Sequence, residues 1–399
     1  MSNPSRRAFL VAGSLTALAS SRAFGANDKL RIGVIGAGQR MDTLLDCADR
    51  VGPNDIVAVS DAYGQRSEAV VRRSTSLPGT PATVYPDYRG VLDHKDIDAV
   101  FIASPDHWHV RMAVAALAAG KDVYLEKPVT HTLEEGATLT NAVRSSKQIL
   151  QCGMQQRSWT HFRSAVELVQ GGSIGRVVQV RTYWWQNYQR STAPGSPRTA
   201  LKMDELNWKQ WLGGAPDQPF SEDKFYRWRW YWNFGGGAMT DLFTHWIDVV
   251  QWAMQSDQPS QAFMLGGKYV FPEWDCPDTV QAAFRYPGHD GQGFDVVYEG
   301  MMASSIDDGG IEFRGTEATL KLNRGGFTVY REGVPHDQNP ILSEKSFRDG
   351  TITHMQNFFD CVKSRKEPNA PVETGVAAAR AGHIGNLAYH GNGQTKWPA

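Results

Sequence analysis

Residues 30–41, LRIGVIGAGQRM, decide the fold of the N-terminal half of this chain. A short apolar run opens the stretch and predicts a buried strand, and a glycine-rich turn follows it directly. Gly36 permits the tight turn, and Gly38 lets the backbone approach a phosphate that faces the free N–H groups of the next helix. Met41 stands where this motif usually has a third small residue, which loosens the contact between helix and strand. The stretch predicts a strand, a turn and a helix that bind a dinucleotide.

The next apolar run, residues 56–60, predicts a second strand and ends at Asp61. A carboxylate at that place can accept hydrogen bonds from both ribose hydroxyls of the nucleotide, and it repels a 2′-phosphate. The sequence therefore favours NAD over NADP. Arg66 keeps NADP open, because a nearby cation can accommodate the extra phosphate.

Later strands alternate with helical stretches, which predicts a doubly wound parallel sheet. The apolar runs at 99–103 and 122–125 each end in polar residues, and ligands of such sheets lie at the carboxyl ends of the strands. His109 follows the first of these runs and is more often structural or cofactor-facing than catalytic. The predicted cofactor-binding residues are Gly36, Gly38, Gln39, Arg40, Asp61, Ser104, Pro105, His109, Glu126 and Lys127.

A glycine-rich turn also precedes the main motif of the second half. Three glycines at 235–237 lead into an expected helix over 238–254 that carries Asp241 and His245. A spacing of four residues puts both side chains on one helix face. That face could be a solvated surface, or it could bring a carboxylate and an imidazole to a substrate.

Composition excludes several classes of protein. The chain has 399 residues with 41 basic and 42 acidic side chains, and this balance gives no reason to expect nucleic-acid binding. The four cysteines form no Cys-x-x-Cys pair, so no metal site is expected, and Cys47 and Cys361 fall in expected helices. We expect mostly unpaired buried thiols and no membrane-spanning segment.

The first 25 residues have the pattern of an export signal. Arg6 and Arg7 precede an apolar run over 9–19, which is too short to span a bilayer. Small residues follow near 25, where a signal peptidase could cut. A twin-arginine signal of this kind exports a protein that is already folded, to the periplasm or beyond. The alternative is a chance arginine pair before an ordinary secretory signal.

Four motifs in this order resemble the family of glucose-fructose oxidoreductase, inositol dehydrogenase and rhizopine-catabolism proteins (Gfo/Idh/MocA). They are residues 33–38, 104–109, 126–128 and the Gly236-Gly237 pair followed by Asp241 and His245. The resemblance implies a Rossmann NAD-binding domain over 28–150. It also implies a C-terminal α/β domain over 151–399, whose large open and mainly antiparallel sheet is used for homo-oligomerisation.

The same resemblance assigns roles at the site. It implies that His245 is the acid or base, that Asp241 positions it or the substrate, and that Lys127 donates to the reacting oxygen. General-base help of this kind is worth about 10²- to 10⁴-fold in rate. Arg157 and Trp185 are predicted substrate contacts. The many tryptophans fit either core packing or a wall against sugar rings.

Export limits the chemistry, because no free NAD pool exists outside the cytosol to replace a lost cofactor. The first hypothesis is an oxidoreductase that acts on a CH–OH group of a sugar or polyol with a tightly bound cofactor. The alternative is a redox-neutral glycoside hydrolase or lyase that oxidises its substrate transiently and eliminates the glycosidic bond. The motif around Asp241 and His245 follows the dehydrogenase pattern. Lys127, Asp241 and His245 together argue against a non-catalytic sugar sensor.

Overall fold

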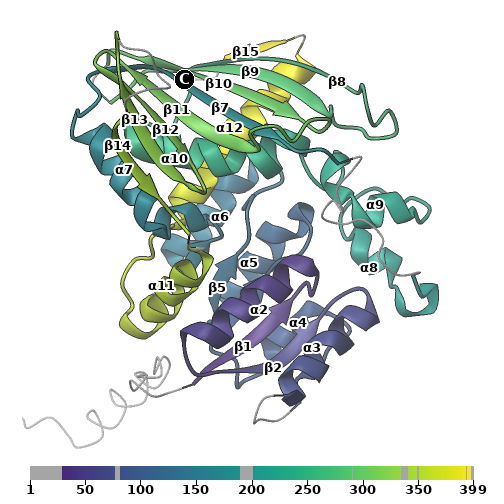
Figure 1. The fold of residues 1–399 in the computed structure, drawn as a ribbon. Coiled ribbons are helices and arrows are strands. Elements are labelled where there is room, and N and C mark those ends of the chain that lie inside the picture. Colours follow the sequence, from purple (N-terminus) through teal and green to yellow (C-terminus); the bar gives the residue numbers. More distant parts are fainter. Residues whose placement is uncertain are drawn as a thin grey trace, which may run out of the picture.

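The chain folds around two sheets, which a computed structural model describes (Figure 1). The N-terminal sheet has six parallel strands in the order β3-β2-β1-β4-β5-β6. The described residues are 29–76, 81–188, 201–289, 291–333, 340–347, 350–391 and 393–396. The predicted export signal therefore lies outside them. The six strands are β1 (Leu30–Ile35), β2 (Asn54–Ser60), β3 (Thr83–Val84), β4 (Ala99–Ile102), β5 (Asp122–Leu125) and β6 (Leu150–Cys152).

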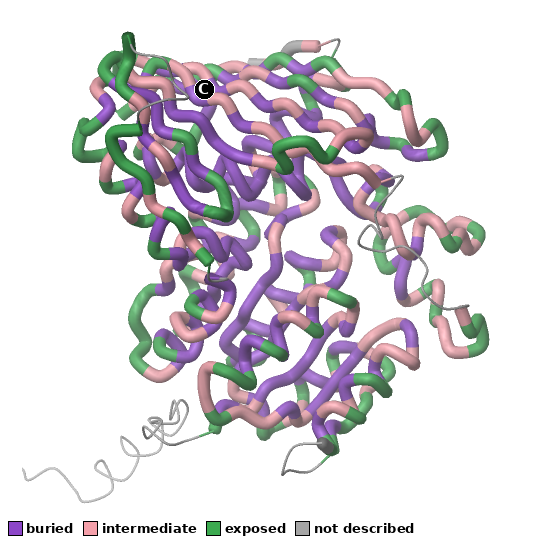
Figure 2. The backbone as a smooth tube through the Cα atoms, in the orientation of Figure 1, coloured by how far each residue is buried: buried purple, intermediate pink, exposed green. Residues whose placement is uncertain are grey.

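This parallel sheet confirms the predicted Rossmann architecture. β4 and β5 are buried along their whole length, as expected of a parallel sheet covered on both faces (Figure 2). The strand order reverses between β1 and β4, and that switch point is where such sheets bind ligands. The helices are α2 (Gln39–Val51), α3 (Gly64–Ser76), α4 (Tyr88–Asp93), α5 (His109–Ala118) and α6 (Glu135–Ser145).

A helix from the far end of the chain completes this domain. Helix α11 (Thr351–Ser364) packs on α2, and its Met355, Phe358 and Phe359 belong to the same buried cluster as β1 and α2. The hydrophobic core of the first domain therefore includes residues beyond the boundary predicted at residue 150, because α11 packs into that core.

The C-terminal sheet is large and mainly antiparallel, as the family resemblance implied. Its order is β14-β13-β12-β11-β7-β10-β9-β8-β15, and only β7 and β10 pair in parallel. The strands are β7 (Val177–Trp185), β8 (Gln261–Gly267), β9 (Thr279–Tyr286), β10 (Phe294–Met301), β11 (Gly309–Gly315), β12 (Ala318–Asn323), β13 (Gly326–Arg331), β14 (Pro340–Lys345) and β15 (Gln394–Lys396).

Helices gather on one face of this sheet (Figure 1). They are α7 (Thr160–Gln170), α10 (Thr244–Met254) and α12 (Val372–His390). β10 alternates buried and half-buried side chains, which is the pattern of a sheet with one covered face. On β8 the alternate residues Phe263 and Leu265 are exposed, Leu265 by 72%.

Residues 201–234, which we name the strap, reach from the C-terminal domain back to the first one. The strap contains two short helices, α8 (Trp208–Leu212) and α9 (Glu222–Tyr226). Its Asn207 N–H donates to the Ala62 carbonyl at 2.8 Å, and Gln210 Nε2 donates to the Pro86 carbonyl at 2.6 Å. Trp108 Nε1 returns a bond to the Trp211 carbonyl at 2.9 Å. The sequence did not predict these contacts.

Two further expectations concern the cysteines and the membrane. All four cysteines are buried thiols outside any disulfide, as predicted. Within the described part of the chain, no helix combines the length and apolar character needed to cross a bilayer.

Candidate active site

A cavity of about 740 Å³ lies where the first domain, the strap and the C-terminal domain meet. Its walls include the carboxyl ends of β1, β2, β4 and β5, which is where parallel sheets place ligands. All ten predicted cofactor residues border it, and so do Asp241 and His245. The structure thus gathers at one cavity residues that are more than 200 positions apart in the sequence.

The first glycine turn forms a cradle that no larger residue could form. Gly36 has a φ of +79°, and a Cβ added there would sit 2.7 Å from the Ser104 nitrogen. Gly38 precedes α2 without a side-chain cap, so the first N–H groups of this helix face the cavity as an anion site. This geometry fits the pyrophosphate of a dinucleotide.

Asp61 braces the same turn and keeps capacity for a ligand. Its Oδ2 accepts from the Ala37 N–H at 2.7 Å, and its Oδ1 accepts from the Tyr63 N–H at 2.8 Å. Each carboxylate oxygen can accept a second hydrogen bond. Asp61 can therefore hold the loop and receive the ribose hydroxyls that the sequence predicted for it.

Arg40 and Glu126 act as a pair at the edge of the cavity. Arg40 Nε donates to Glu126 Oε1 at 2.7 Å, and Glu126 is 5% exposed. Burial opposes the charge on Arg40, but the attraction of Glu126 outweighs it and raises the pKa of the guanidinium. The Arg40 Nη2 is buried and has no hydrogen-bond partner among the described residues. Glu126 therefore positions Arg40.

His109 has a supporting place rather than a catalytic one. Its two ring nitrogens lie 2.6 Å from the Pro128 carbonyl oxygen and 2.8 Å from the Ser104 carbonyl oxygen. The side chain is buried, and burial lowers its pKa. His109 ties together the loops after β4 and β5, which both border the cavity.

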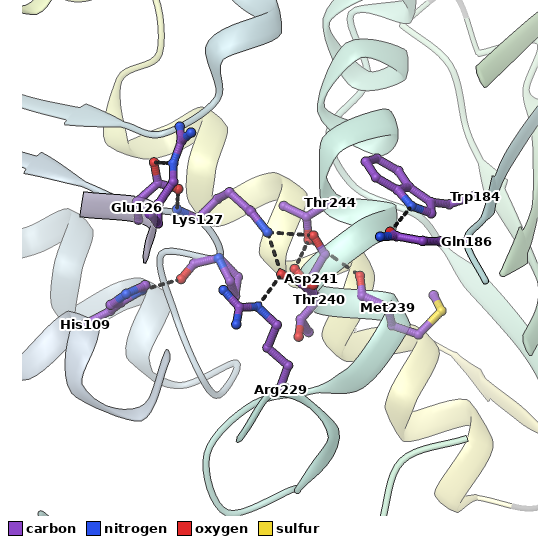
Figure 3. Close-up of polar contacts among 12 residues, drawn as sticks. His109, Glu126, Lys127, Trp184, Gln186, Arg229, Met239, Thr240, Asp241 and Thr244 are labelled. Atoms are coloured by element: carbon purple, nitrogen blue, oxygen red, sulfur yellow. Dashed lines mark hydrogen bonds and ion pairs between the residues drawn. The ribbon is translucent and has the colours of Figure 1, made fainter. Parts of the chain in front are cut away.

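Lys127, Asp241 and Arg229 form a partly buried ionic cluster, in which Asp241 is the most deeply buried (Figure 3). Lys127 Nζ donates to Asp241 Oδ1 at 2.6 Å and to the Asp241 carbonyl at 2.8 Å. Arg229 Nε donates to the same Oδ1 at 3.1 Å. Burial alone would raise the pKa of Asp241, but Lys127 and Arg229 outweigh it, so the pKa is lowered and the group stays a carboxylate. Asp241 therefore fixes the Lys127 ammonium.

His245 lies at the start of α10, one turn beyond Asp241. Residues 239–243 form a π-helical turn, a feature frequent at functional sites, where the sequence predicted regular helix. The His245 ring is 6% exposed and packs against Trp184 with centroids 5.6 Å apart. Burial lowers its pKa well below 6.5, and Lys127, Arg324 and Arg40 lower it further. The imidazole is neutral at neutral pH, and its Nδ1 has no hydrogen-bond partner among the described residues.

Two predicted substrate contacts are not at the cavity. Strand β7 alternates its side chains, so Trp184 borders the cavity while Trp185 points to the other face of the sheet, against Tyr183. Arg157 is also displaced, because its Nε donates to both oxygens of buried Asp248, at 2.8 and 3.0 Å. Neither residue borders the cavity, so this geometry does not support them as substrate contacts there, and both assignments stay predictions.

The sequence missed several residues of this site. Arg229 sits within a tryptophan-rich run that was interpreted as packing or a sugar wall, and its charge was the available signal. Arg324 lies in the turn after β12, far from any motif. The cavity is further bordered by Gln186 and Tyr188 after β7 and by Trp211, Phe225 and Trp228 of the strap.

Comparison with known proteins agrees with this architecture. Residues 30–154 match the oxidoreductase family with an NAD-binding Rossmann fold, and residues 166–389 match the C-terminal α/β domain of the same family. The chain therefore belongs to the Gfo/Idh/MocA family of nicotinamide-dependent oxidoreductases, and the match to an NAD-binding domain favours NAD over NADP as its cofactor.

Two curated relatives show the extent of the sequence similarity. The chain is 34% identical over 352 residues to the uncharacterized oxidoreductase YrbE of Bacillus subtilis, covering 87% of this chain and 91% of that protein. It is 31% identical over 186 residues to inositol 2-dehydrogenase of Klebsiella pneumoniae, covering 46% of this chain. The chain spans about half, 54%, of that relative's length.

Solved structures share the fold. Levoglucosan dehydrogenase in complex with NADH and levoglucosan superimposes with a TM-score of 0.72 at 19% identity, covering 93% of this chain and 100% of that one. The myo-inositol 2-dehydrogenase of Lactobacillus plantarum gives a TM-score of 0.69 at 20% identity, covering 93% of this chain and 100% of that one.

Proposed function

We propose that this protein oxidises a CH–OH group of a sugar or polyol, with NAD held tightly as the cofactor. The observation that carries the proposal is the Lys127 ammonium, fixed by Asp241 in the same cavity as the neutral His245. The named activities of its relatives, inositol and levoglucosan dehydrogenation, support a carbohydrate substrate.

The arrangement divides the work between two side chains. The Lys127 ammonium has three N–H donors. Two of them donate to Asp241, one to its carboxylate and one to its backbone carbonyl, and the third is left for the oxygen of the substrate. The neutral His245 borders the same cavity, and a ring nitrogen of a neutral imidazole can take the hydroxyl proton. Bound NAD supplies the hydride acceptor. The positive charge of Lys127 stabilises the negative charge that develops on the substrate oxygen.

The test uses the purified protein with the nucleotide that it retains. Free sugars and aryl glycosides are added separately, and the absorbance of reduced nicotinamide is recorded. Appearance or loss of this band with a free sugar supports the oxidoreductase. Aryl release without a net change in the band supports the redox-neutral hydrolase instead. Absence of any bound nucleotide contradicts tight binding.

The strap supports a tightly held cofactor. It bonds to Ala62 and Tyr63, directly after the Asp61 that is expected to hold the ribose. The Arg66 guanidinium lies over the Phe225 ring of the strap, 4.7 Å from its centroid. A dinucleotide in this cavity would be enclosed between the strap and the sheet, so its release requires these contacts to open.

Phe225→Ala tests the strap. We expect the variant to lose nucleotide during gel filtration while the wild type retains it, as measured by the nucleotide content of the denatured protein. Lys209→Ala is the control, since Lys209 is on the strap but exposed. Equal retention by all three proteins would show that the strap does not hold the cofactor.

Export by the twin-arginine route remains part of the proposal. Arg6 and Arg7 support it from the sequence, and a cofactor carried within a folded protein suits that route. Replacing both by lysine should stop export, and cell fractionation would show it. Export of the double variant at the wild-type level would favour the ordinary secretory signal.

We also propose that the protein forms a homo-oligomer through the open face of its C-terminal sheet. The exposed Phe263 and Leu265 of β8 support it, since exposed apolar side chains on the same face of a strand favour association. Leu265→Asp should lower the mass measured by light scattering. An unchanged mass, or a monomeric wild type, would contradict this interface.

A further inference from the structure

Gln155 is a buried amide that borders the cavity and has no role in the mechanism above. The residue is only 7% exposed. Its Oε1 atom is buried and has no hydrogen-bond partner among the described residues. Such an atom destabilises the folded protein, and in a native protein it calls for an explanation, of which a role at a functional site is one. An apolar side chain of the same length would avoid this loss of stability.

The backbone places Gln155 between the elements that carry Lys127 and His245. Strands β5 and β6 pair with Leu125 opposite Cys152, so Lys127 and Gln155 lie two and three residues beyond the same point of two neighbouring strands. On its other side, the short 3₁₀ helix that begins at Gln155 packs against α10, the helix that carries His245. Gln155 therefore borders the cavity at its catalytic end.

Contacts on both sides hold this segment in place. Arg157 Nε donates to both carboxylate oxygens of Asp248 on α10, at 2.8 and 3.0 Å. The Gly153 N–H donates to the Leu125 carbonyl at 2.7 Å. A Cβ at Gly153 would lie 2.8 Å from the Glu126 carboxylate, so the chain after β6 lies directly against the loop that continues into Lys127. The amide of the next residues is thus presented from a fixed backbone.

Only one end of the Gln155 amide can meet the cavity. Because Oε1 is buried, the group that Gln155 can offer to a ligand is its Nε2, which carries two N–H donors. An amide N–H donates to the oxygen of a neutral hydroxyl and adds no charge to the ionic cluster beside it. A sugar or polyol has further hydroxyls next to the one that is oxidised, and these are suitable acceptors.

We propose that Gln155 is a specificity-determining residue whose Nε2 donates a hydrogen bond to a second hydroxyl of the substrate, adjacent to the carbinol that Lys127 and His245 hold. This inference rests on the proposed oxidoreductase function and specifies its substrate as a compound with two neighbouring hydroxyls. A site that binds a hydroxyl through a hydrogen bond rejects an analogue without it, because the polar group of the protein is then left unpaired.

Two adjacent glutamines provide a matched pair of variants. Gln155→Met keeps the length of the side chain and removes the amide, so it should lower kcat/KM about tenfold or more while the melting temperature of the sugar-free protein stays equal or rises. The control is Gln156→Met. Gln156 is 1% exposed and its buried Nε2 also lacks a partner among the described residues, but it does not border the cavity. Gln156→Met should therefore keep the wild-type kcat/KM. A lower melting temperature of Gln155→Met with unchanged kcat/KM would assign it a structural role and overturn the proposal.

Deoxy analogues identify the hydroxyl that Gln155 binds. Myo-inositol, levoglucosan and D-glucose are titrated into the NAD-loaded protein by calorimetry, and the tightest binder is compared with its monodeoxy analogues. We expect one analogue to lose about tenfold or more in affinity for the wild type and to lose little for Gln155→Met, as two groups in contact require in a double-mutant cycle. Equal losses in both proteins for every analogue, or no binding of any of the three compounds, overturn the proposal.

Two further measurements separate this proposal from the function on which it rests. Reduction of the bound nicotinamide is recorded with each compound. Binding that depends on Gln155 without any reduction contradicts the oxidoreductase function and leaves the Gln155 contact in place. The nucleotide content of Gln155→Met is also measured. Loss of NAD with unchanged discrimination among the analogues would assign the amide to the cofactor and overturn the proposal.

Discussion

The two ends of the cavity are built in different ways. The cofactor end depends mainly on a short run of sequence, in which Gly36, Gly38 and the start of α2 form the anion cradle. The catalytic end joins Lys127 of the first domain, Arg229 of the strap and Asp241 before α10. The comparison shows that backbone conformation makes the first end, whereas long-range side-chain contacts make the second. Substitutions at the cofactor end should therefore weaken NAD binding, whereas substitutions at the catalytic end should lower the rate of the reaction.

Lys127→Ala should have the largest effect, because it removes the donor to the reacting oxygen and leaves Asp241 with one of its two cations. We expect kcat/KM to fall about 10³-fold or more, measured by nicotinamide reduction. Bound NAD should remain, since the cradle is untouched. Lys95→Ala is the control on an exposed lysine of the same domain. Activity within a few fold of wild type would remove Lys127 from the mechanism.

His245→Ala should lower kcat/KM by about 10²- to 10⁴-fold, the usual worth of a general base. The wild-type pH profile sharpens this assignment. The pKa of His245 lies well below 6.5, so the neutral form that accepts a proton is present above that lowered pKa and is lost only as the pH falls through it. We expect the acidic limb of kcat/KM to lie below pH 6.5. A limb above that value would contradict the assignment.

Gly36→Ala should break the other end of the cavity. A Cβ there meets Ser104 and forces a left-handed φ on alanine, at a cost of about 1–3 kcal/mol. We expect the Kd for NAD to rise about tenfold or more, measured on nucleotide-free protein by fluorescence titration. Gly120→Ala is the matched control, since Gly120 has a φ of +71° but open space at its Cβ. Similar NAD affinities in the two variants would show that the close approach to Ser104 is unimportant.

The smallest effects should separate two adjacent tryptophans. Trp184→Ala removes a ring that contacts His245 and should lower kcat/KM by about tenfold, the order expected for losing one packed aromatic contact. Trp185→Ala, on the opposite face of β7, should change kcat/KM little. A larger loss in Trp185→Ala would restore the original substrate assignment of that residue.

Much of the fold could be predicted from the sequence because its elements follow short local patterns. The strand, turn and helix at 30–41 and the carboxyl-end positions of Asp61, Ser104 and Glu126 all border one cavity, as predicted. Trp185 and Arg157 do not border this cavity, for a definite physical reason. The face of a strand residue depends on register, and the partner of an arginine depends on which acid the fold brings near it.

The sequence by itself determined the dinucleotide-binding sheet and the identity of the chemical groups, because glycine turns, strand ends and an Asp–His spacing of four are properties of short segments. Only the tertiary structure decided what those groups contact. It placed Asp241 on Lys127 and Arg229, brought Arg324 to Trp184, and laid the strap across the loop after Asp61. These pairings join residues far apart in the chain, and they depend on how the two sheets pack together rather than on local sequence.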